Sequence, residues 1–265
     1  MDQPNPFRLA KNAIEQDYRA LVYDDIGSTN DEAMRLAREG DPGRLWLIAK
    51  TQSKGRGRRG RQWASPAGNL YASLLLIDAV PARFAPQLGF VAGIALAHAL
   101  RECIGDDPRL RLKWPNDILF DGAKLAGILL ESAVLADGRF ACVLGIGVNC
   151  ITYPNALSYR ATALAEIAAR QYQAEDVFLH LSGTLLSGLE LFAKNAGFDA
   201  IRQEWLAFAA GLGDPIRVET PTGSVIGIFR TIDASGRLIL ACGDTEKIIE
   251  AGDVWLTEPV EGSIE

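Results

Sequence analysis

Four strand-like runs follow one another closely in the middle of the chain and constrain the fold more than any other feature. They are residues 109–114, 117–120, 127–135 and 139–148. Asp121-Gly122 follows the second run, and Asp137-Gly138 separates the last two. An Asp-Gly pair between apolar runs is a strong signal for a tight hairpin turn. The sequence therefore predicts an antiparallel sheet in this region.

Further strands and helices are predicted on both sides of these runs. The expected strands are residues 21–26, 45–50 and 69–77, and the expected helices are residues 27–40, 86–104, 162–169, 174–195 and 198–210. In the first helix, Thr29 is the expected N-cap, Glu32 would complete a capping box, and Gly40 would end the helix. Together these elements predict an α+β fold, a mixed β-sheet with flanking helices.

The pattern changes near Gly211. Short β-rich runs alternate from there with the turn-forming stretches PTG, ASG and GDT. Closely spaced strands of this kind are typical of a small all-β unit. We therefore expect two domains, a larger one over residues 1–212 and a small all-β barrel over residues 213–265.

Composition indicates a globular protein with an acidic balance. The chain has 265 residues, 48% of them hydrophobic, and a formal net charge of −6. No apolar leader is evident, and the most apolar run, residues 88–100, is too short to span a bilayer, so we expect no membrane association. The four cysteines form no C-x-x-C pair, which favours free thiols in a reducing cytoplasm.

A basic segment interrupts this acidic chain. Residues 53–63, SKGRGRRGRQW, hold five basic side chains and three glycines between positions 54 and 61. Glycines let backbone N–H groups approach an anion while guanidinium groups clamp it. On these residues alone, a solvated charged loop, a nucleic-acid patch and a phosphate-holding loop all stay open. The local extent of the charge favours a small anionic ligand over a DNA-binding surface.

Four other motifs carry polar groups at the ends of predicted elements. They are GSTN at 27–30, KWPNDI at 113–118, KLAGILLE at 124–131 and GIGVN at 145–149. Each has an ordinary explanation: a helix cap, an Asx turn, a solvent-facing lysine or a packed strand end. Each motif also suits a ligand site. In KWPNDI, Pro115 interrupts a strand, so that Asn116 and Asp117 could point from a rigid turn into a cleft. Small residues likewise admit a planar ring close to the backbone.

Together the motifs resemble those of biotin protein ligases. GSTN, Gln52, GRGRRGRQWASP, KWPNDI, KLAGIL and GIGVN occur in the order and rough spacing of that family, and the β-rich end resembles its C-terminal domain. The resemblance implies a class II synthetase-like, biotin–lipoyl ligase-like catalytic domain followed by an SH3-like barrel. It also implies that biotin and ATP form biotinyl-5'-AMP, from which biotin passes to a lysine of a biotin carboxyl carrier protein domain.

The resemblance assigns roles to residues of this sequence. The implied biotin-binding residues are Ser28, Thr29, Asn30, Gln52, Arg56, Gly57, Arg58 and Lys124. The implied ATP-binding residues are Arg56, Arg58, Arg59, Arg61, Trp63, Asn116, Lys124 and Asn149. The implied catalytic residues are Lys124, Arg58 and Asp117. Lys124 would bind the carboxylate and α-phosphate oxygens, the arginine loop would close over the adenylate, and Asp117 would orient or deprotonate the incoming amine.

Cofactor and partners follow from the same resemblance. The implied cofactor is Mg²⁺ bound with ATP, for which the sequence assigns no protein ligands. The implied acceptor is the carrier domain of a biotin-dependent carboxylase, and a homodimer is common in the family. Some members carry an N-terminal DNA-binding domain, whereas the first expected strand begins here at residue 21. We therefore expect the ligase-only form, without specific DNA binding.

Two other functions compete with this interpretation. A lipoate or octanoate ligase or transferase would share the fold, but its R-R-x-S-G-G-G type stretch is replaced here by GRGRRGR. A nucleic-acid-binding module with an SH3-like tail would explain the arginines but not KWPNDI, KLAGIL or GIGVN. The acidic net charge also disfavours that module.

Overall fold

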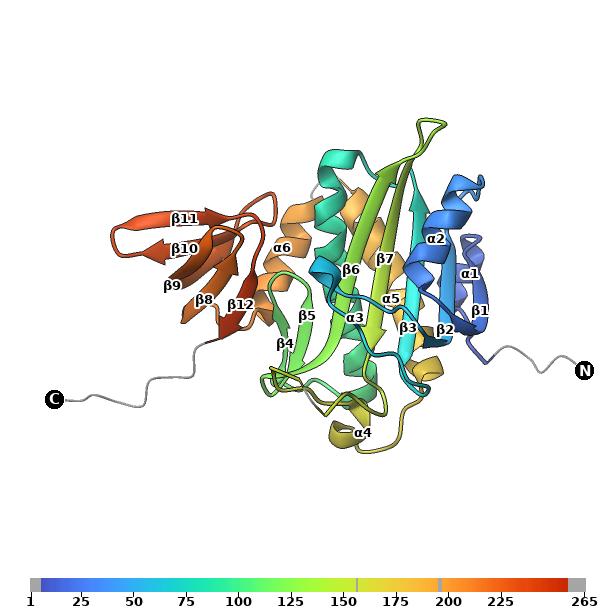
Figure 1. Ribbon diagram of the computed structural model, residues 1–265, viewed down its shortest axis with the longest axis horizontal. Coiled ribbons are helices and arrows are strands. Elements are labelled where there is room, and N and C mark those ends of the chain that lie inside the picture. The colour runs from blue at the N-terminus through green and yellow to red at the C-terminus, as the bar shows by residue number, and fades with distance from the viewer. Residues whose placement is uncertain (1–5, 156, 195–196, 257–265) are drawn as a thin grey trace, which may run out of the picture.

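A seven-stranded mixed sheet forms the body of the protein (Figure 1). The structure is a computed structural model that describes residues 6–155, 157–194 and 197–256. In spatial order the strands are β1 (Arg19–Ile26), β2 (Leu45–Gln52), β3 (Leu70–Ile77), β7 (Phe140–Val148), β6 (Ala123–Val134), β5 (Asp117–Phe120) and β4 (Leu110–Lys113). β1 and β2 pair in parallel, and the other neighbours are antiparallel. The predicted mixed sheet is confirmed.

Both Asp-Gly pairs form turns where the sequence predicts them. Asp121 and Gly122 both have positive φ, 49° and 73°, between β5 and β6. Positive φ at both central residues is the requirement of a type I′ turn, which matches the twist of a hairpin. Gly138 (φ 85°) turns the chain between β6 and β7. Local turn chemistry therefore sets the antiparallel half of the sheet.

Helices cover both faces of the sheet. α3 (Leu88–Ile104), α5 (Ala174–Ala193) and α6 (Gly197–Phe208) lie on one face, and α2 (Thr29–Arg38) lies on the other (Figure 1). The shorter segments are α1 (Lys11–Glu15), α4 (Leu164–Ile167) and the 3₁₀ turns η1 (Arg58–Gly60) and η2 (Ala82–Gln87). The last residue of the predicted helix 174–195 lies outside the described residues.

The helix α3 belongs to the core. Together with η2 it forms a helical stretch, Ala82–Ile104, that is long and apolar enough to cross a membrane by length and composition. Of its most apolar window, 72% is buried inside the protein. A helix that is apolar on all sides and surrounded by other elements is typical of a protein interior.

The N-terminus of α2 is capped one residue earlier than the sequence predicts. Ser28 is the N-cap, and its hydroxyl oxygen accepts a hydrogen bond from Asp31 N at 3.4 Å. Thr29, the predicted N-cap, is instead the first helical residue and is buried. Glu32 pairs with Arg35 rather than completing a capping box. The capping-box spacing of Thr29 and Glu32 favoured threonine, although serine is the stronger N-cap by residue type.

A second, wholly antiparallel sheet forms the C-terminal part. In spatial order its strands are β11 (Thr245–Ile249), β10 (Leu238–Cys242), β9 (Gly223–Ile232), β8 (Pro215–Thr220) and β12 (Asp253–Leu256). The prediction of a small all-β unit is confirmed for these strands. Residues 257–265 of the expected barrel lie outside the described residues.

The two sheets share one hydrophobic core. The Trp205 ring of α6 lies 6.5 Å from the Phe229 ring of β9, measured between centroids. The Trp114 indole N–H, in the turn after β4, donates to the Gly236 carbonyl of the second sheet at 3.0 Å. Side chains of both sheets belong to the same cluster of buried residues. This packing holds β12 beside the turn between β4 and β5, next to the candidate site.

Candidate active site

Motifs that are far apart in the sequence converge on one cavity. Its walls come from the N-terminus of α2, the end of β2, the basic segment, the turn between β4 and β5, strands β6 and β7, and the start of β12. The predicted site residues that line it are Ser28, Thr29, Asn30, Gln52, Arg56, Gly57, Arg58, Arg61, Trp63, Asn116, Asp117 and Lys124. Two other predicted residues, Arg59 and Asn149, do not line this cavity.

Trp63 packs against the backbone of the sheet, and glycines make this approach possible. A Cβ atom at Gly147 would lie 2.7 Å from the indole, and one at Gly127 would lie 3.2 Å from it. Only glycine fits where another group comes this close to a strand. The small residues of GIGVN and KLAGIL therefore admit a planar ring, and that ring belongs to the protein itself.

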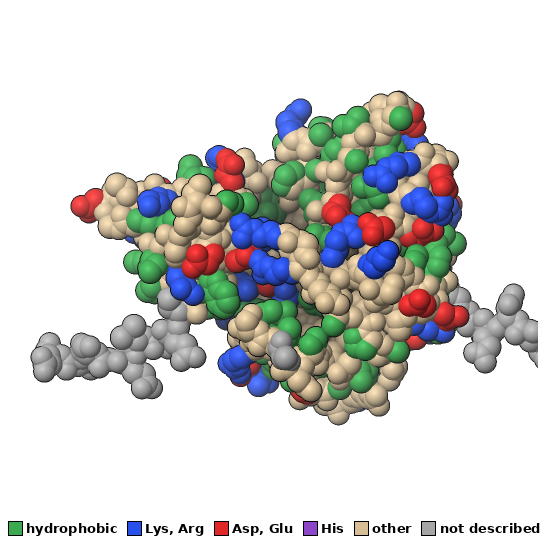
Figure 2. Space-filling model, viewed as in Figure 1, with side chains coloured by type: hydrophobic (Ala, Val, Ile, Leu, Met, Phe, Trp, Pro, Cys, Tyr) green, Lys and Arg blue, Asp and Glu red, His purple; other side chains and the backbone are tan. Residues whose placement is uncertain are grey.

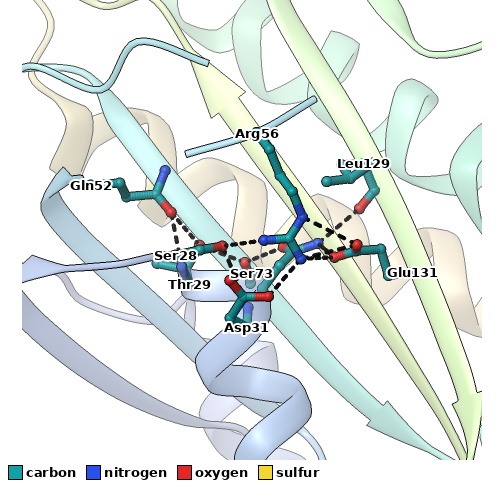
Figure 3. A network of polar contacts seen from close by, with 9 residues as sticks. Ser28, Thr29, Asp31, Gln52, Arg56, Ser73, Leu129 and Glu131 are labelled. Atoms are coloured by element: carbon teal, nitrogen blue, oxygen red, sulfur yellow. Dashed lines mark hydrogen bonds and ion pairs between the residues drawn. The ribbon is translucent and has the colours of Figure 1, made fainter. Parts of the chain in front are cut away.

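Hydroxyl and amide side chains form one part of the cavity, the neutral end, which comprises Ser28, Thr29, Asn30 and Gln52 (Figure 3). Thr29 N donates to Gln52 Oε1 at 2.8 Å, and Thr29 Oγ1 lies 3.1 Å from the same oxygen. Ser73 Oγ lies 2.7 Å from Thr29 Oγ1 and 2.6 Å from Asn30 Oδ1. Because Ser73 is fully buried in β3, these contacts connect the cavity wall to the core of the sheet.

Arg56 lies beside the neutral end and is paired with two acids (Figure 3). One guanidinium nitrogen lies 2.8 Å from Glu131 Oε2 and 2.7 Å from Asp31 Oδ1. Another donates to Ser28 Oγ at 3.3 Å. Hydrogen bonds with Asp31, and to a lesser extent with Glu131, raise the pKa of Arg56 although partial burial opposes them. Arg56 therefore links the basic segment to α2 and β6 through ion pairs.

Basic side chains form the other part of the cavity, the cationic end, which comprises Lys124, Arg58 and Arg61 with acidic partners, and Lys113 lies beside it. Lys124 Nζ lies 2.6 Å from Asp117 Oδ1, and Lys113 Nζ lies 3.2 Å from Asp117 Oδ2. Burial acts to raise the pKa of Asp117, but the charges and hydrogen bonds of the two lysines outweigh it and hold that pKa below its usual range. Asp117 is therefore a carboxylate fixed between two ammonium groups.

Two aromatic rings flank the Lys124 ammonium group. Nζ lies 5.4 Å from the centroid of the Trp63 ring and 5.5 Å from that of Tyr159. These distances allow a cation–π attraction. Lys124 is thus held in one place at the centre of the cavity by a carboxylate and two rings.

The basic segment contacts the C-terminal sheet through one carboxylate. Arg59 lies 3.2 Å from Asp253 Oδ2, and Arg61 pairs with the same oxygen. Figure 2 shows Lys and Arg side chains gathered, with acidic side chains beside them, on the face where the two sheets meet. Asp253 is the first residue of β12, so the two parts of the chain meet at the rim of the cavity.

Arg58 lies deeper than its neighbours. It donates to Asn116 Oδ1 at 3.3 Å and to the Gly252 carbonyl at 3.2 Å. Burial lowers the pKa of Arg58, although the charges of Asp253 and Asp117 partly offset that effect. A guanidinium group with little water around it gains more from an anion than an exposed one does. Arg58 is therefore well placed to meet a bound phosphate.

Asn149, the last residue of GIGVN, does not line the main cavity. Its side-chain amide donates to the backbone carbonyls of Lys124 and Thr162, at 3.4 and 3.1 Å. It lines an adjoining cavity that also has Trp63 and Tyr159 in its wall. Trp63 and Lys124 border both cavities, so the second is an extension of the first.

Acidic groups in the described part of the chain do not gather as metal ligands. Among the described residues, no group of three or more His, Cys, Asp or Glu side chains could hold a metal ion. The carboxylates nearest the cavity, Asp117 and Asp253, are each engaged by two basic side chains.

Comparison with known proteins identifies the family. Residues 26–149 match the model of the Biotin/lipoate A/B protein ligase family, and residues 211–256 match that of the Biotin protein ligase C terminal domain. A biotin–[acetyl-CoA-carboxylase] ligase of Paracoccus denitrificans is 42% identical over 232 residues, which cover 86% of this chain and 96% of that protein. The chain belongs to the biotin protein ligase family.

Two further proteins of this family are similar to the chain over most of their length. A biotin–[acetyl-CoA-carboxylase] ligase of Mycobacterium tuberculosis is 35% identical over 242 residues, covering 88% of this chain and 87% of that protein. The biotin protein ligase from Aquifex aeolicus, solved in complex with biotin and ATP, has a TM-score of 0.76 at 28% identity. The matched region covers 89% of this chain and 97% of the Aquifex chain.

Glu131, Ser73 and Asp253 are among the residues of this ligase-family site that were not found from the sequence. Glu131 is the last residue of KLAGILLE, and strand alternation places it on the same face as Gly127 and Leu129, which line the cavity. Ser73 stands out as a hydroxyl in the apolar strand β3. Both signals were available. Asp253 offers no such signal, because it is 192 positions from Arg61.

Proposed function

We propose that this chain activates biotin with ATP to biotinyl-5'-AMP and then transfers biotin to a lysine of a biotin carboxyl carrier protein domain. The observation that carries the proposal is one cavity with a neutral, hydrogen-bonding end and a cationic end. Biotin has matching parts, an uncharged ureido ring and a carboxylate, and ATP supplies the phosphates. The names of the relatives and the Aquifex complex with biotin and ATP support the same activity.

At the neutral end, Ser28, Thr29 and Gln52 are the proposed partners of the ureido group. Both hydrogen bonds described for Ser28 Oγ use it as the acceptor, which leaves its hydrogen for a ligand carbonyl. A buried ureido group needs such partners, because each polar atom left unpaired is costly to desolvate. Asn30 supports Thr29 through Ser73, and Arg56 and Gly57 line the same cavity.

In the first proposed step, a carboxylate oxygen of biotin attacks the α-phosphorus of ATP. The new P–O bond forms as the bond from the α-phosphorus to its bridging oxygen breaks, and pyrophosphate leaves. Lys124 and Arg58 stabilise the charge that gathers on the α-phosphate, because both are already held in the cavity before reaction. Mg²⁺ would be held by the phosphates of ATP, because Asp117 and Asp253 are paired with basic groups, and it would neutralise phosphate charge.

The remaining predicted nucleotide residues divide between two places. Arg61 and Asn116 line the main cavity with Arg58 and are proposed phosphate and ribose contacts, and Arg59 adds charge at the rim. Arg56 is committed to two carboxylates and contributes less to the phosphates. The adjoining cavity between Trp63 and Asn149 is the proposed position of adenine, because an indole offers a face for stacking.

In the second proposed step, the acceptor amine attacks the carbonyl carbon of the adenylate. The C–N bond forms, the bond from the carbonyl carbon to the phosphate oxygen breaks, AMP leaves, and the amine releases a proton to water. The low pKa of Asp117 makes it a weak base near neutral pH. We therefore assign Asp117 to orienting Lys124 and the incoming amine, rather than to removing the proton.

We further propose that the protein acts in the cytoplasm, because the proposed reaction needs access to both ATP and a carrier domain. Residues 1–212 would form the catalytic domain, and residues 213–265 would support the basic segment through Asp253. The acidic net charge argues against sequence-specific DNA binding. For a homodimer, the candidate surface is the part of the sheet formed by residues 107–150.

The direct test is biotin-dependent exchange of pyrophosphate into ATP in the presence of Mg²⁺. We expect exchange with biotin and little exchange with lipoate or octanoate, which lack a ureido group. Lipoate is the informative comparator, because the first matching family model covers biotin and lipoate ligases together. Equal exchange with lipoate would overturn the assignment of the substrate.

A further inference from the structure

We propose that Lys113 is a positioning residue that offsets part of the charge of Asp117, so that the Lys124 ammonium group stays available to an anionic substrate. The inference rests on the proposed function, in which Lys124 and Arg58 stabilise the α-phosphate. It extends that function to a side chain of the KWPNDI motif that lines neither the main nor the adjoining cavity. Lys113 therefore acts through Asp117 and does not touch the substrate.

The hairpin of β4 and β5 places Lys113 beside Asp117. Lys113 is the last residue of β4 and pairs across the hairpin with Asp117, the first residue of β5. Its Nζ lies 3.2 Å from Asp117 Oδ2, whereas Lys124 Nζ lies 2.6 Å from the other oxygen, Oδ1. Each carboxylate oxygen therefore has its own lysine, and the two ammonium groups do not compete for one oxygen.

The second sheet holds the Lys113 side chain in this position. Lys113 Nζ donates to the Val254 carbonyl of β12 at 3.4 Å. Val254 directly follows Asp253, which pairs with the basic segment at the rim of the cavity. A backbone carbonyl carries no net charge, so this contact orients Lys113 and leaves its positive charge for Asp117. Two consecutive residues of β12 thus support the cationic end.

Low exposure makes the balance of charge important here. The side chains of Lys113, Lys124 and Asp117 are 23%, 18% and 13% exposed. Charges with little water around them are weakly screened, so each acts strongly on its neighbours. Two ammonium groups and one carboxylate leave an excess of positive charge, whereas Lys124 and Asp117 alone would form a neutral pair.

A neutral pair is a poorer partner for an anion. Asp117 also attracts Arg58, and this attraction opposes the lowering of the Arg58 pKa by burial. Without Lys113, the whole charge of Asp117 would act on Lys124 and Arg58. The charge that gathers on the phosphate would then meet cations that are already partly neutralised. Lys113 thus lets the carboxylate fix the position of Lys124 without cancelling its charge.

The test is a double-mutant cycle in biotin-dependent pyrophosphate exchange. Lys113→Gln removes the charge and keeps an N–H donor, and Asp117→Asn removes the carboxylate through which Lys113 acts. We expect Lys113→Gln to lower kcat about tenfold, less than the loss of a group that touches the phosphate. The KM for ATP should stay within about threefold, because substrate contacts are unchanged.

The Asp117→Asn background identifies the route of the effect. There, Lys113→Gln should change kcat by less than about twofold, because no carboxylate is left to offset. The slower rates of this background are measured at a raised enzyme concentration, so that they are still resolved.

Lys113→Arg is the conservative variant and Lys50→Gln is the matched control. Arginine keeps the positive charge, so kcat should stay within about threefold of the parent. Lys50→Gln removes the lysine of another Lys–Asp pair, 2.7 Å apart and outside the cavity, and should leave exchange unchanged. If Lys113→Gln does not fold, Lys113→Met, which keeps an unbranched side chain, replaces it with the same expected results.

The outcomes separate the two levels of inference. If the parent protein shows no biotin-dependent exchange, the proposed function is wrong. If the parent exchanges and the loss of the Lys113 charge changes kcat by less than about twofold, the inference about Lys113 is wrong. An equal loss in both backgrounds would show that Lys113 contacts the substrate itself, and it would overturn the inference too. So would a loss in Lys113→Arg as large as that in Lys113→Gln, because charge would then not be the cause.

Discussion

The two ends of the cavity are built in different ways. The neutral end uses short side chains on α2 and β2, fixed by hydrogen bonds to the buried Ser73. The cationic end uses long side chains from a loop and one strand, held by carboxylates. An uncharged ligand group is recognised by donor and acceptor direction, which needs a rigid frame. A charged group is recognised by attraction, which long side chains deliver over a range of positions.

The comparison also explains why acidic residues lie in a site for anions. The basic groups gathered at and beside this end of the cavity would repel one another, and Asp117 and Asp253 offset that repulsion. Each acid is shared by two basic groups, so the local charge stays positive. A phosphate can therefore take over part of the pairing without leaving a buried cation unpaired. The predictions below change one end at a time.

The largest effect is expected at the cationic end, from Lys124→Gln. Losing one preorganised charge at a reacting group typically slows catalysis about 10²- to 10³-fold. We therefore expect pyrophosphate exchange to fall by that factor while the affinity for biotin alone changes much less. Exchange kinetics and calorimetry measure the two quantities.

Lys50→Gln is the control for this change. Lys50 lies on β2 and pairs only with the exposed Asp24 in the contacts described, so its loss should leave exchange unchanged. If Lys124→Gln exchanges pyrophosphate within a few-fold of the parent, the cationic end does not contribute to the chemical step.

The next effect is expected at the neutral end, from Gly145→Ala. A Cβ atom there would lie 2.2 Å from Asn30 Oδ1, and that amide is buried and fixed by Ser73 and Glu131. Asn30 must move, so we expect biotin to bind about tenfold more weakly and the protein to lose about 1–3 kcal/mol of stability. Calorimetry and urea denaturation measure both.

Gly89→Ala is the matched control. Gly89 lies in α3, and a Cβ atom there would meet no heavy atom within 4 Å. Alanine is the better helix former, so stability should stay equal or rise by about 0.4–1 kcal/mol. Biotin affinity that stays unchanged in Gly145→Ala would show that the frame of the neutral end is not rigid.

These two sets of residues also show how much the sequence could predict. The mixed sheet and its hairpins were predictable because Asp121-Gly122 and Asp137-Gly138 act locally. Most of the cavity wall was predictable because its motifs combine backbone constraints with functional side chains. The cap at Ser28 was missed because the capping-box spacing of Thr29 and Glu32 indicated a start one residue later, and the contact of Thr29 with the buried Ser73 depends on the fold.

Contacts between distant segments mark the limit of the sequence. Asp253 meets Arg59 and Arg61 only because the C-terminal sheet packs on Trp114 and α6. No periodicity in either segment indicates this contact. In the same way, the chemistry of Asn149 was suggested by its motif, but its two backbone partners depend on the fold.

A smaller effect is expected at the junction of the two sheets, from Asp253→Asn. The change releases Arg59 and Arg61, which are partly exposed, so the cost is that of surface ion pairs. We expect the KM for ATP to rise about two- to fivefold with little change in affinity for biotin. Asp244→Asn, in an exposed turn of the same sheet, is the control. An equal rise in the biotin dissociation constant would show that the two ends are not independent.

The smallest effect is expected in the pH dependence of Asp117. Its folded pKa lies below the usual range, so the carboxylate is fully ionised throughout the neutral range. The stability that it contributes is present above the ordinary aspartate pKa and is lost only as the pH falls through the lower folded value. For biotin transfer, the ratio of the parent rate to the Asp117→Asn rate should therefore vary by less than about twofold between about pH 6 and pH 9. A base that titrates near neutral pH would instead make this ratio rise with pH up to its own pKa. Stopped assays of transfer to the carrier domain at each pH measure the ratio, and a clear rise would assign proton removal to Asp117 after all.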